Sequence, residues 1–167
     1  YEGQLSAGLE AGKISQNYLV AYRKSDGYRR HGDLDRLSLA GKWFFNPNDD
    51  VRIGAIARYY KSNALEPGYL TFADSRNDPR MTNAYNVSDG DTRDIVQSAL
   101  TLDVSFSDRL DWSSLAYFNR LRDDRYVKFS AGASQQRRLT KEDHHGFSTA
   151  LHWHGELGGA PLMLEAG

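Results

Sequence analysis

Apolar and polar residues alternate with a period of two along most of the chain. In the first twelve residues, Leu5, Ala7 and Leu9 fall on one face, while Gln4 and Glu10 fall on the other. A helix, with its longer period, would scatter these two sets around its surface, whereas a strand separates them. The same pattern recurs along the chain and predicts eight strands, at about 1–12, 18–23, 36–45, 51–59, 96–106, 110–119, 147–154 and 162–167.

The connections between these strands alternate in length. The short ones are expected at 13–16, 46–50, 107–109 and 155–160, and the long ones at 26–34, 62–94 and 123–144. Short inner turns and long outer loops are typical of barrels of the bacterial outer membrane. A compact soluble domain seldom contains an unstructured loop of about 30 residues. The predicted fold is therefore all-β, with antiparallel strands forming part of a large transmembrane β-barrel. A soluble sandwich with an aromatic core is the alternative.

The order of the connections also predicts where the chain ends lie. Because the first and last connections are both short, the free ends of the first and eighth strands belong on the side of the long loops. Complete bacterial barrels place both termini at the periplasmic side instead. We therefore expect residues 1–167 to be consecutive strands of a larger barrel rather than a closed eight-stranded one.

Composition narrows the choice of function. The 21 basic and 22 acidic residues nearly cancel, so nothing indicates nucleic acid as a partner. The absence of cysteine excludes disulfides, thiolate metal sites and thiol nucleophiles. The chain has no apolar run of about 18 residues, which excludes a transmembrane helix. Rings at Trp43, Phe45, Phe106 and Trp153 adjoin the short turns, and Tyr59 adjoins the longest loop, as expected for interfacial girdles.

Several segments resemble the TonB-dependent outer-membrane receptors. Residues 24–31, KSDGYRRH, resemble the SDGYR-x-H segment common in that family, and residues 33–42 are similar to the strand that follows it. The EPGYLT and NDPR sequences at 66–71 and 77–80 resemble a loop of the ferric dicitrate and siderophore receptor branch. Residues 107–110, SDRL, resemble an inner turn of the family. The resemblance covers nearly all of the chain.

This resemblance implies a specific arrangement and function. Residues 1–167 would be a fragment of about eight strands from a plugged 22-stranded barrel, with the plug domain not present in them. The parent protein would lie in the outer membrane of a Gram-negative bacterium and import a ferric siderophore, ferric citrate or a similar iron chelate. The TonB–ExbB–ExbD system would act through the missing plug, and lipid and lipopolysaccharide would surround the barrel. A passive porin or channel, and a surface barrel enzyme or adhesin, are the alternatives.

Cations and tyrosines gather in or beside the long connections. Arginine matches the geometry of carboxylates, and ferric chelates of citrate or carboxylate siderophores are anionic. The candidate ligand-binding residues are Tyr28, Arg29, Arg30, His31, Tyr69, Arg76, Arg80, Arg122, Arg125, Arg137 and Arg138. Alternatively, these cations bind lipopolysaccharide phosphates, pair with neighbouring aspartates or are only solvated.

Other motifs give weaker indications. His152 and His154 point to one face of a strand, but two imidazoles do not complete a metal site, so we expect lumen residues that touch the plug. The sequence from Asp89 to Asp91 lacks the spaced ligands of a calcium loop, which favours a simple turn. No GxSxG, phosphate-loop or HExxH motif is present. We therefore predict no metal, no cofactor and no enzymatic activity.

Overall fold

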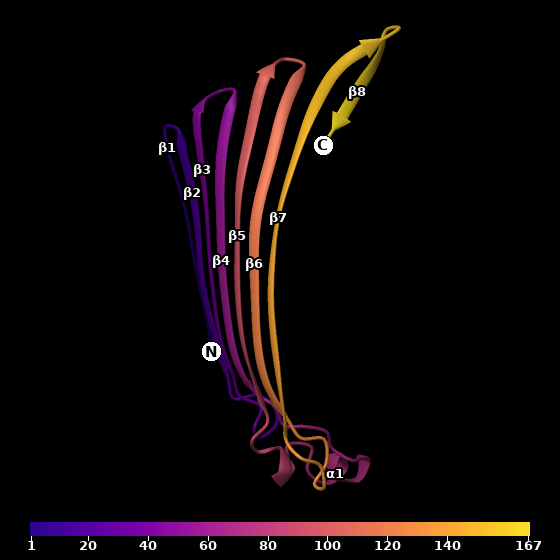
Figure 1. The fold of residues 1–167 in the computed structure, drawn as a ribbon. Coiled ribbons are helices and arrows are strands. Elements are labelled where there is room, and N and C mark those ends of the chain that lie inside the picture. Colours follow the sequence, from indigo (N-terminus) through magenta and orange to yellow (C-terminus); the bar gives the residue numbers. More distant parts are fainter.

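A computed structural model describes residues 1–167 as a single antiparallel sheet of eight strands. Each strand pairs with its neighbours in sequence, so the order is β1 to β8 without a crossover (Figure 1). The strands are β1 (Glu2–Ala11), β2 (Ile14–Ser25), β3 (Leu34–Asn48), β4 (Val51–Leu65), β5 (Gly90–Ser107), β6 (Leu110–Val127), β7 (Gln136–Leu157) and β8 (Ala160–Ala166). The predicted all-β class and strand number are confirmed.

Short and long connections alternate as predicted. The short turns are 12–13, 49–50, 108–109 and 158–159, and the long connections are 26–33, 66–89 and 128–135. The last turn is built on Gly158 and Gly159, whose φ angles of 61° and 83° suit a tight hairpin. All four turns lie at one end of the sheet, and the long connections gather at the other (Figure 1). We call these the turn end and the loop end.

The strands reach further toward the loop end than the sequence pattern indicated. The connection expected at 62–94 is only 66–89, and the one expected at 123–144 is only 128–135. Near the loop end both faces of the strands carry polar residues, so the alternation that reveals a strand is lost although the backbone pairing continues. The bounds predicted for these two connections were wrong for that reason.

The longest connection is also more ordered than expected. It contains helix α1 (Phe72–Asn77) and the 3₁₀ helix η1 (Ala84–Asn86). Thr71 caps the N-terminus of α1, because its hydroxyl oxygen accepts a hydrogen bond from the Asp74 backbone N–H at 3.1 Å. Neither of these two helices is long and apolar enough to cross a bilayer.

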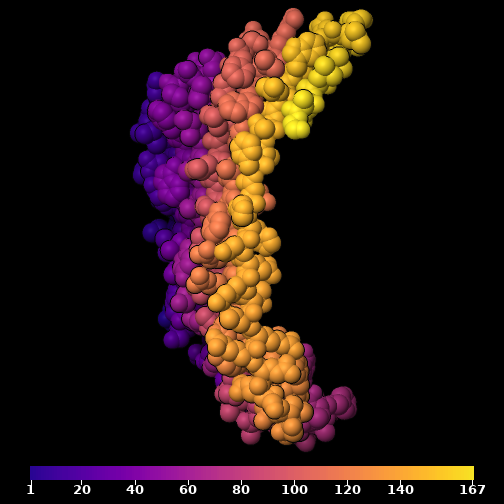
Figure 2. All heavy atoms as spheres, viewed as in Figure 1, coloured from indigo at the N-terminus to yellow at the C-terminus, as the bar shows by residue number.

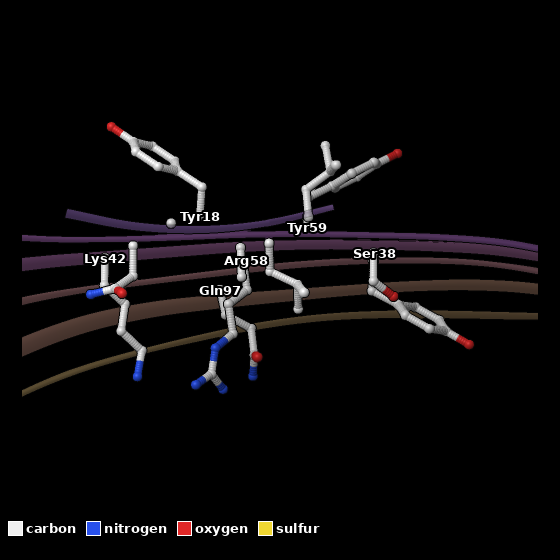
Figure 3. Close-up of a pocket in the computed structure, with 12 residues that line it drawn as sticks. Tyr18, Ser38, Lys42, Arg58, Tyr59 and Gln97 are labelled. Carbon is white, nitrogen blue, oxygen red and sulfur yellow. The ribbon is translucent and has the colours of Figure 1, made fainter. Parts of the chain in front are cut away.

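The register divides the side chains into two faces, because directly paired residues point to the same side. The apolar face carries rows such as Leu5–Val20–Leu39. The polar face carries rows such as Arg58–Gln97. In Figure 3, Tyr18 and Tyr59 project to one side of the strands and Arg58 to the other. The depression drawn there is lined from both faces and is therefore not an enclosed cavity.

The sheet has almost no interior of its own. Val127 is the one apolar residue among the six buried ones. Large side chains of the apolar face remain uncovered, with Leu100 63% and Phe147 69% exposed. The space-filling view shows a thin, curved slab with the connections packed at one end (Figure 2). Because buried apolar area is the main term that offsets chain entropy, this face requires a cover outside these residues.

Candidate functional site at the loop end

Arg29 ties the first long connection to the second. Its guanidinium donates to three backbone carbonyls, those of Pro67 at 2.9 Å, Gly68 at 2.5 Å and Met81 at 2.8 Å. A planar fork of five donors is suited to bridging several acceptors at once. All of these contacts are with the protein itself, so Arg29 holds the loops together.

Asp89 joins all three long connections. The residue is 1% exposed, and its carboxylate accepts hydrogen bonds from the Asn86 side-chain amide at 2.7 Å, the Lys128 backbone N–H at 3.0 Å and the Gln135 side-chain amide at 3.2 Å. His31 Nε2 contacts the Asp89 carbonyl at 2.7 Å. A buried carboxylate is stable only when it is hydrogen-bonded in this way. The prediction of a simple turn here missed this role.

Arg30 and Arg80 add further links between the first two connections. The Arg30 backbone donates to the Arg80 carbonyl at 2.9 Å, and the Arg80 Nε donates to the Tyr28 carbonyl at 2.9 Å. The Arg30 side chain pairs with Asp78, and that hydrogen bond lowers the pKa of Asp78. The loops thus form one linked platform.

The outer rim of this platform presents aromatic rings with arginines above them. Tyr69 is 83% exposed and Tyr28 is 67% exposed. Arg76 lies 5.4 Å from the ring centre of Phe72, and Arg138 lies 5.2 Å from that of Phe129. Stacking orients a guanidinium while leaving donors at its edge available, so the rim can contact flat anionic ligands.

Below the platform, the polar face carries a network of charges at the ends of β5 and β6. Arg125 donates to Glu66 at 2.6 Å, and Arg93 donates to Asp123 at 3.1 Å. Burial, together with the neighbouring Asp123 carboxylate, raises the pKa of Asp91 to about 6. One oxygen of Asp91 is buried without a hydrogen-bond partner, which fits a carboxyl that ionises reluctantly.

A pair of arginines on the polar face was missed by the sequence analysis. Arg23 of β2 and Arg36 of β3 are direct cross-strand partners, so their side chains start from adjacent points of one face. Arg23 has only the distant Glu2 carboxylate, at 4.0 Å, and Arg36 forms no ion pair. Local alternation can indicate the face on which Arg36 lies, but its cross-strand neighbour depends on the register between strands.

The predicted site residues are therefore not all brought together. Arg122 and Arg125 lie on β6, and Arg137 and Arg138 lie on β7, rather than in a loop. Their alternating positions put Arg125 and Arg138 on the polar face but Arg122 and Arg137 on the apolar face. These strands extend further toward the loop end than the alternation of apolar and polar residues indicated.

The two histidines near the turn end share the polar face, as predicted. His152 lies 3.2 Å from the Ser113 hydroxyl and 3.5 Å from Glu165, and His154 lies 3.5 Å from Asp111. These contacts are far along the strands from the loop platform. Whether the pair touches a plug domain stays a prediction.

The sequence matches no known family profile and no curated protein. The structure is similar to the unliganded ferric citrate transporter FecA, with a TM-score of 0.82 and 16% identity over 94% of this chain. It is also similar to the open and closed forms of the ferric-catecholate import receptor Fiu from E. coli K12, with TM-scores of 0.68 and 0.66 and identities of 13% and 14%. The chain spans 26% to 29% of the length of these proteins. Its fold is that of a β-barrel segment of TonB-dependent receptors.

Proposed function

We propose that residues 1–167 form part of the barrel wall of an outer-membrane receptor that imports an anionic iron chelate. The likeness of the fold to ferric citrate and ferric-catecholate receptors supports this proposal. So does a sheet with one apolar and one polar face, which suits a wall between lipid and a watery lumen. The plug domain and the TonB–ExbB–ExbD contact would lie in other parts of a Gram-negative receptor.

The position of the membrane follows from the strand lengths. A tilted strand crosses the hydrocarbon layer in about 9–11 residues. Counted from the turn end of β6, that length covers roughly 110–119, so the remaining residues of the strand extend beyond the bilayer. Trp112 then lies near one interface and Tyr59 near the other, where aromatic girdles are expected. Trp43 lies between them, because its row runs through Ala55 and Leu100 to Ala116. The loop platform faces the exterior.

The observation that carries the ligand class is the Arg23–Arg36 pair. Like charges at opposed cross-strand positions are destabilising, so a receptor gains from an anion that bridges them. Both residues lie on the polar face just beyond the bilayer span, where a chelate entering from outside would arrive. Carboxylate and catecholate chelates of iron carry the negative charge that such a pair requires.

The predicted residues of this side fall into two groups, according to whether the side chain already bonds a neighbouring loop or strand end. We propose that the exposed Tyr28, Tyr69, Arg76 and Arg138 meet the ligand first. We assign the positioning of loops and strand ends to the others, Arg29, Arg30, His31, Arg80 and Arg125. We leave out Arg122 and Arg137, since they face away from the lumen.

The test uses the full-length receptor with both polar-face arginines neutralised, as Arg23→Gln with Arg36→Gln. Binding is measured by equilibrium titration with ferric citrate and with a ferric catecholate as probes. Loss of charge-assisted bonds worth about 1.5–3 kcal/mol each predicts at least about a tenfold weaker Kd for the anion that binds there. Arg109→Gln, which removes the same charge at the turn end, is the matched control and should bind normally.

Two outcomes would contradict the proposal. Unchanged affinity of the double variant for both probes would remove the arginine pair from the site. Uptake that continues after a protonophore collapses the energy supply would indicate a passive channel instead of an energised receptor.

A further inference from the structure

A third arginine lies in the same row of the polar face as the Arg23–Arg36 pair. Ser62 of β4 is the direct partner of Arg36, and Arg93 of β5 is the direct partner of Ser62. Adjacent strands are about 4.8 Å apart, so Arg36 and Arg93 start roughly 10 Å apart, with only a small, buried serine between them. Both guanidiniums can therefore reach a single anion that lies over β4.

Acids hold Arg93 on its other side. Its guanidinium donates to the Asp123 carboxylate at 3.1 and 3.4 Å and lies 3.7 Å from Asp91. The next row toward the turn end offers no carboxylate on β4, β5 or β6. Its residues on these strands are Tyr60, Ile95 and Leu121. Because the Arg93 side chain is still 44% exposed, only the two acids keep it from an anion over the polar face.

The acids here outnumber the cations that pair with them. Arg125 donates to Glu66 at 2.6 and 3.0 Å, which leaves Arg93 to serve both Asp91 and Asp123. One oxygen of Asp91 is buried without a hydrogen-bond partner, so this acid is the least satisfied of the three. Its partner on β4 is the uncharged Ala64. The charged and titratable groups that face Asp91 are Arg93 of β5, Glu66 of the connection after β4, Asp123 and Arg125 of β6, Arg138 of β7 beyond Arg125, and His31 and Asp89 on the loop side.

One proton relieves this excess of acid. Burial and a hydrogen bond with Asp123 raise the pKa of Asp91 to about 6. When two carboxyls share a proton, their joint negative charge is halved, so their attraction for Arg93 weakens. The guanidinium is then able to turn toward an anion on the side of Arg36.

We propose that the polar-face site binds an anionic chelate together with one proton, which Asp91 and Asp123 hold between them, and that Arg93 is the third arginine of the protonated site. Water supplies the proton, and no covalent bond of the chelate changes. By reciprocity, the bound anion stabilises the protonated pair as much as the proton strengthens anion binding. Affinity therefore rises as the pH falls from 7.5 through about 6. This inference rests on the proposed function and adds regulation by pH to the same site.

Isothermal titration calorimetry of the full-length receptor in detergent counts the proton. Ferric citrate, or the ferric catecholate if only that probe binds, is titrated at pH 6.5 in two buffers of different ionisation enthalpy. The wild type should take up about half a proton more per bound chelate than Asp91→Asn, which cannot titrate. Protonation of the chelate itself cancels in this comparison. Asp103→Asn, which removes an acid of the same strand and face near the turn end, is the matched control and should behave as the wild type.

Affinity gives a second readout. Asp91→Asn removes an unsatisfied acid and so should fold, and it mimics the protonated site. It should bind the chelate at least about threefold more tightly than the wild type at pH 7.5, with the difference vanishing at pH 5. Arg93→Gln should weaken binding at least about fivefold at pH 5.5 and much less at pH 7.5.

The outcomes separate this inference from the proposed function. Equal proton uptake by the wild type and Asp91→Asn would overturn the proton link, and an equal effect of Arg93→Gln at both pH values would overturn the third arginine. Either result leaves the uptake function standing if Arg23→Gln with Arg36→Gln still abolishes tight binding. Binding of neither probe, or binding that this double variant leaves unchanged, would overturn both proposals.

Discussion

The guanidinium of Arg29 is directed at the backbone of the neighbouring loop and not at solvent. Sequence alone suggested a ligand contact, because an arginine beside Tyr28 in an outer loop suits an anion. The bonds to Pro67, Gly68 and Met81 support a role in positioning the loops, and a contact with ligand stays a prediction. Residue type limits what a side chain can bind, and its position in the fold determines which partner it meets.

Arg29→Lys separates these two roles. Lysine keeps the charge but cannot reach three carbonyls with a planar fork, so we expect amide hydrogen exchange in 66–89 to accelerate at least about tenfold. Hydrogen–deuterium exchange of the full-length protein measures this. Exchange at the wild-type rate, with chelate affinity reduced, would instead show that Arg29 contacts the ligand.

Asp91 gives the loop end a dependence on pH. Its pKa is raised from 3.8 to about 6, so the folded state binds the proton more tightly than the unfolded chain does. The stability of this region should therefore rise as the pH falls through about 6 toward 3.8. At pH 7 the carboxyl is ionised and destabilises the folded region. We expect slower exchange of the neighbouring amides at pH 5 than at pH 7.5, after correction for intrinsic rates.

The control for this pH effect is Asp91→Asn, which removes the titrating group and keeps the shape. Its exchange pattern should vary much less between the two pH values than that of the wild type. An unaltered difference in the variant would assign the effect to another group.

At the scale of the element, each strand combines an apolar and a polar face near the turn end but not near the loop end. The start of β7 illustrates this. Arg137, Leu139 and Lys141 share one face there, although two of them are cations and one is apolar. Alternation could therefore reveal the middle of each strand from sequence, whereas its outer end is fixed by hydrogen bonds to neighbouring strands. The short turns, by contrast, were recognisable from local residues.

Trp43 depends on a glycine two positions before it in β3. Its ring covers Gly41, where an added Cβ would lie 2.2 Å from the indole. Gly41→Ala should displace the ring and destabilise the barrel by about 1–3 kcal/mol. Gly3→Ala, at a position with no atom within 4 Å of the added Cβ, is the matched control in the same sheet. Urea unfolding in detergent or vesicles should show equal stability for the control and a lower midpoint for Gly41→Ala.

At the scale of the whole molecule, the sheet buries very little apolar area of its own. The order of strands leaves β1 and β8 unpaired with each other, and the apolar face is open. Exposed edges and a continuous apolar face both favour aggregation.

Residues 1–167 expressed alone should therefore form inclusion bodies or aggregates in aqueous buffer. Size-exclusion chromatography and limited proteolysis measure this directly. A monodisperse, protease-resistant monomer without detergent would contradict the barrel-wall interpretation.

The sequence by itself determined the strand class, the number of strands and the alternation of short and long connections. These features depend on local periodicity and on turn residues such as Gly158, which act over a few positions. It also indicated that cations collect toward one end. Only the tertiary structure decided which of them meet, because register places Arg23 beside Arg36 on one face and Arg122 beside Lys141 on the other. Such neighbours are joined by interstrand hydrogen bonds across many residues of chain, and local sequence does not specify that pairing.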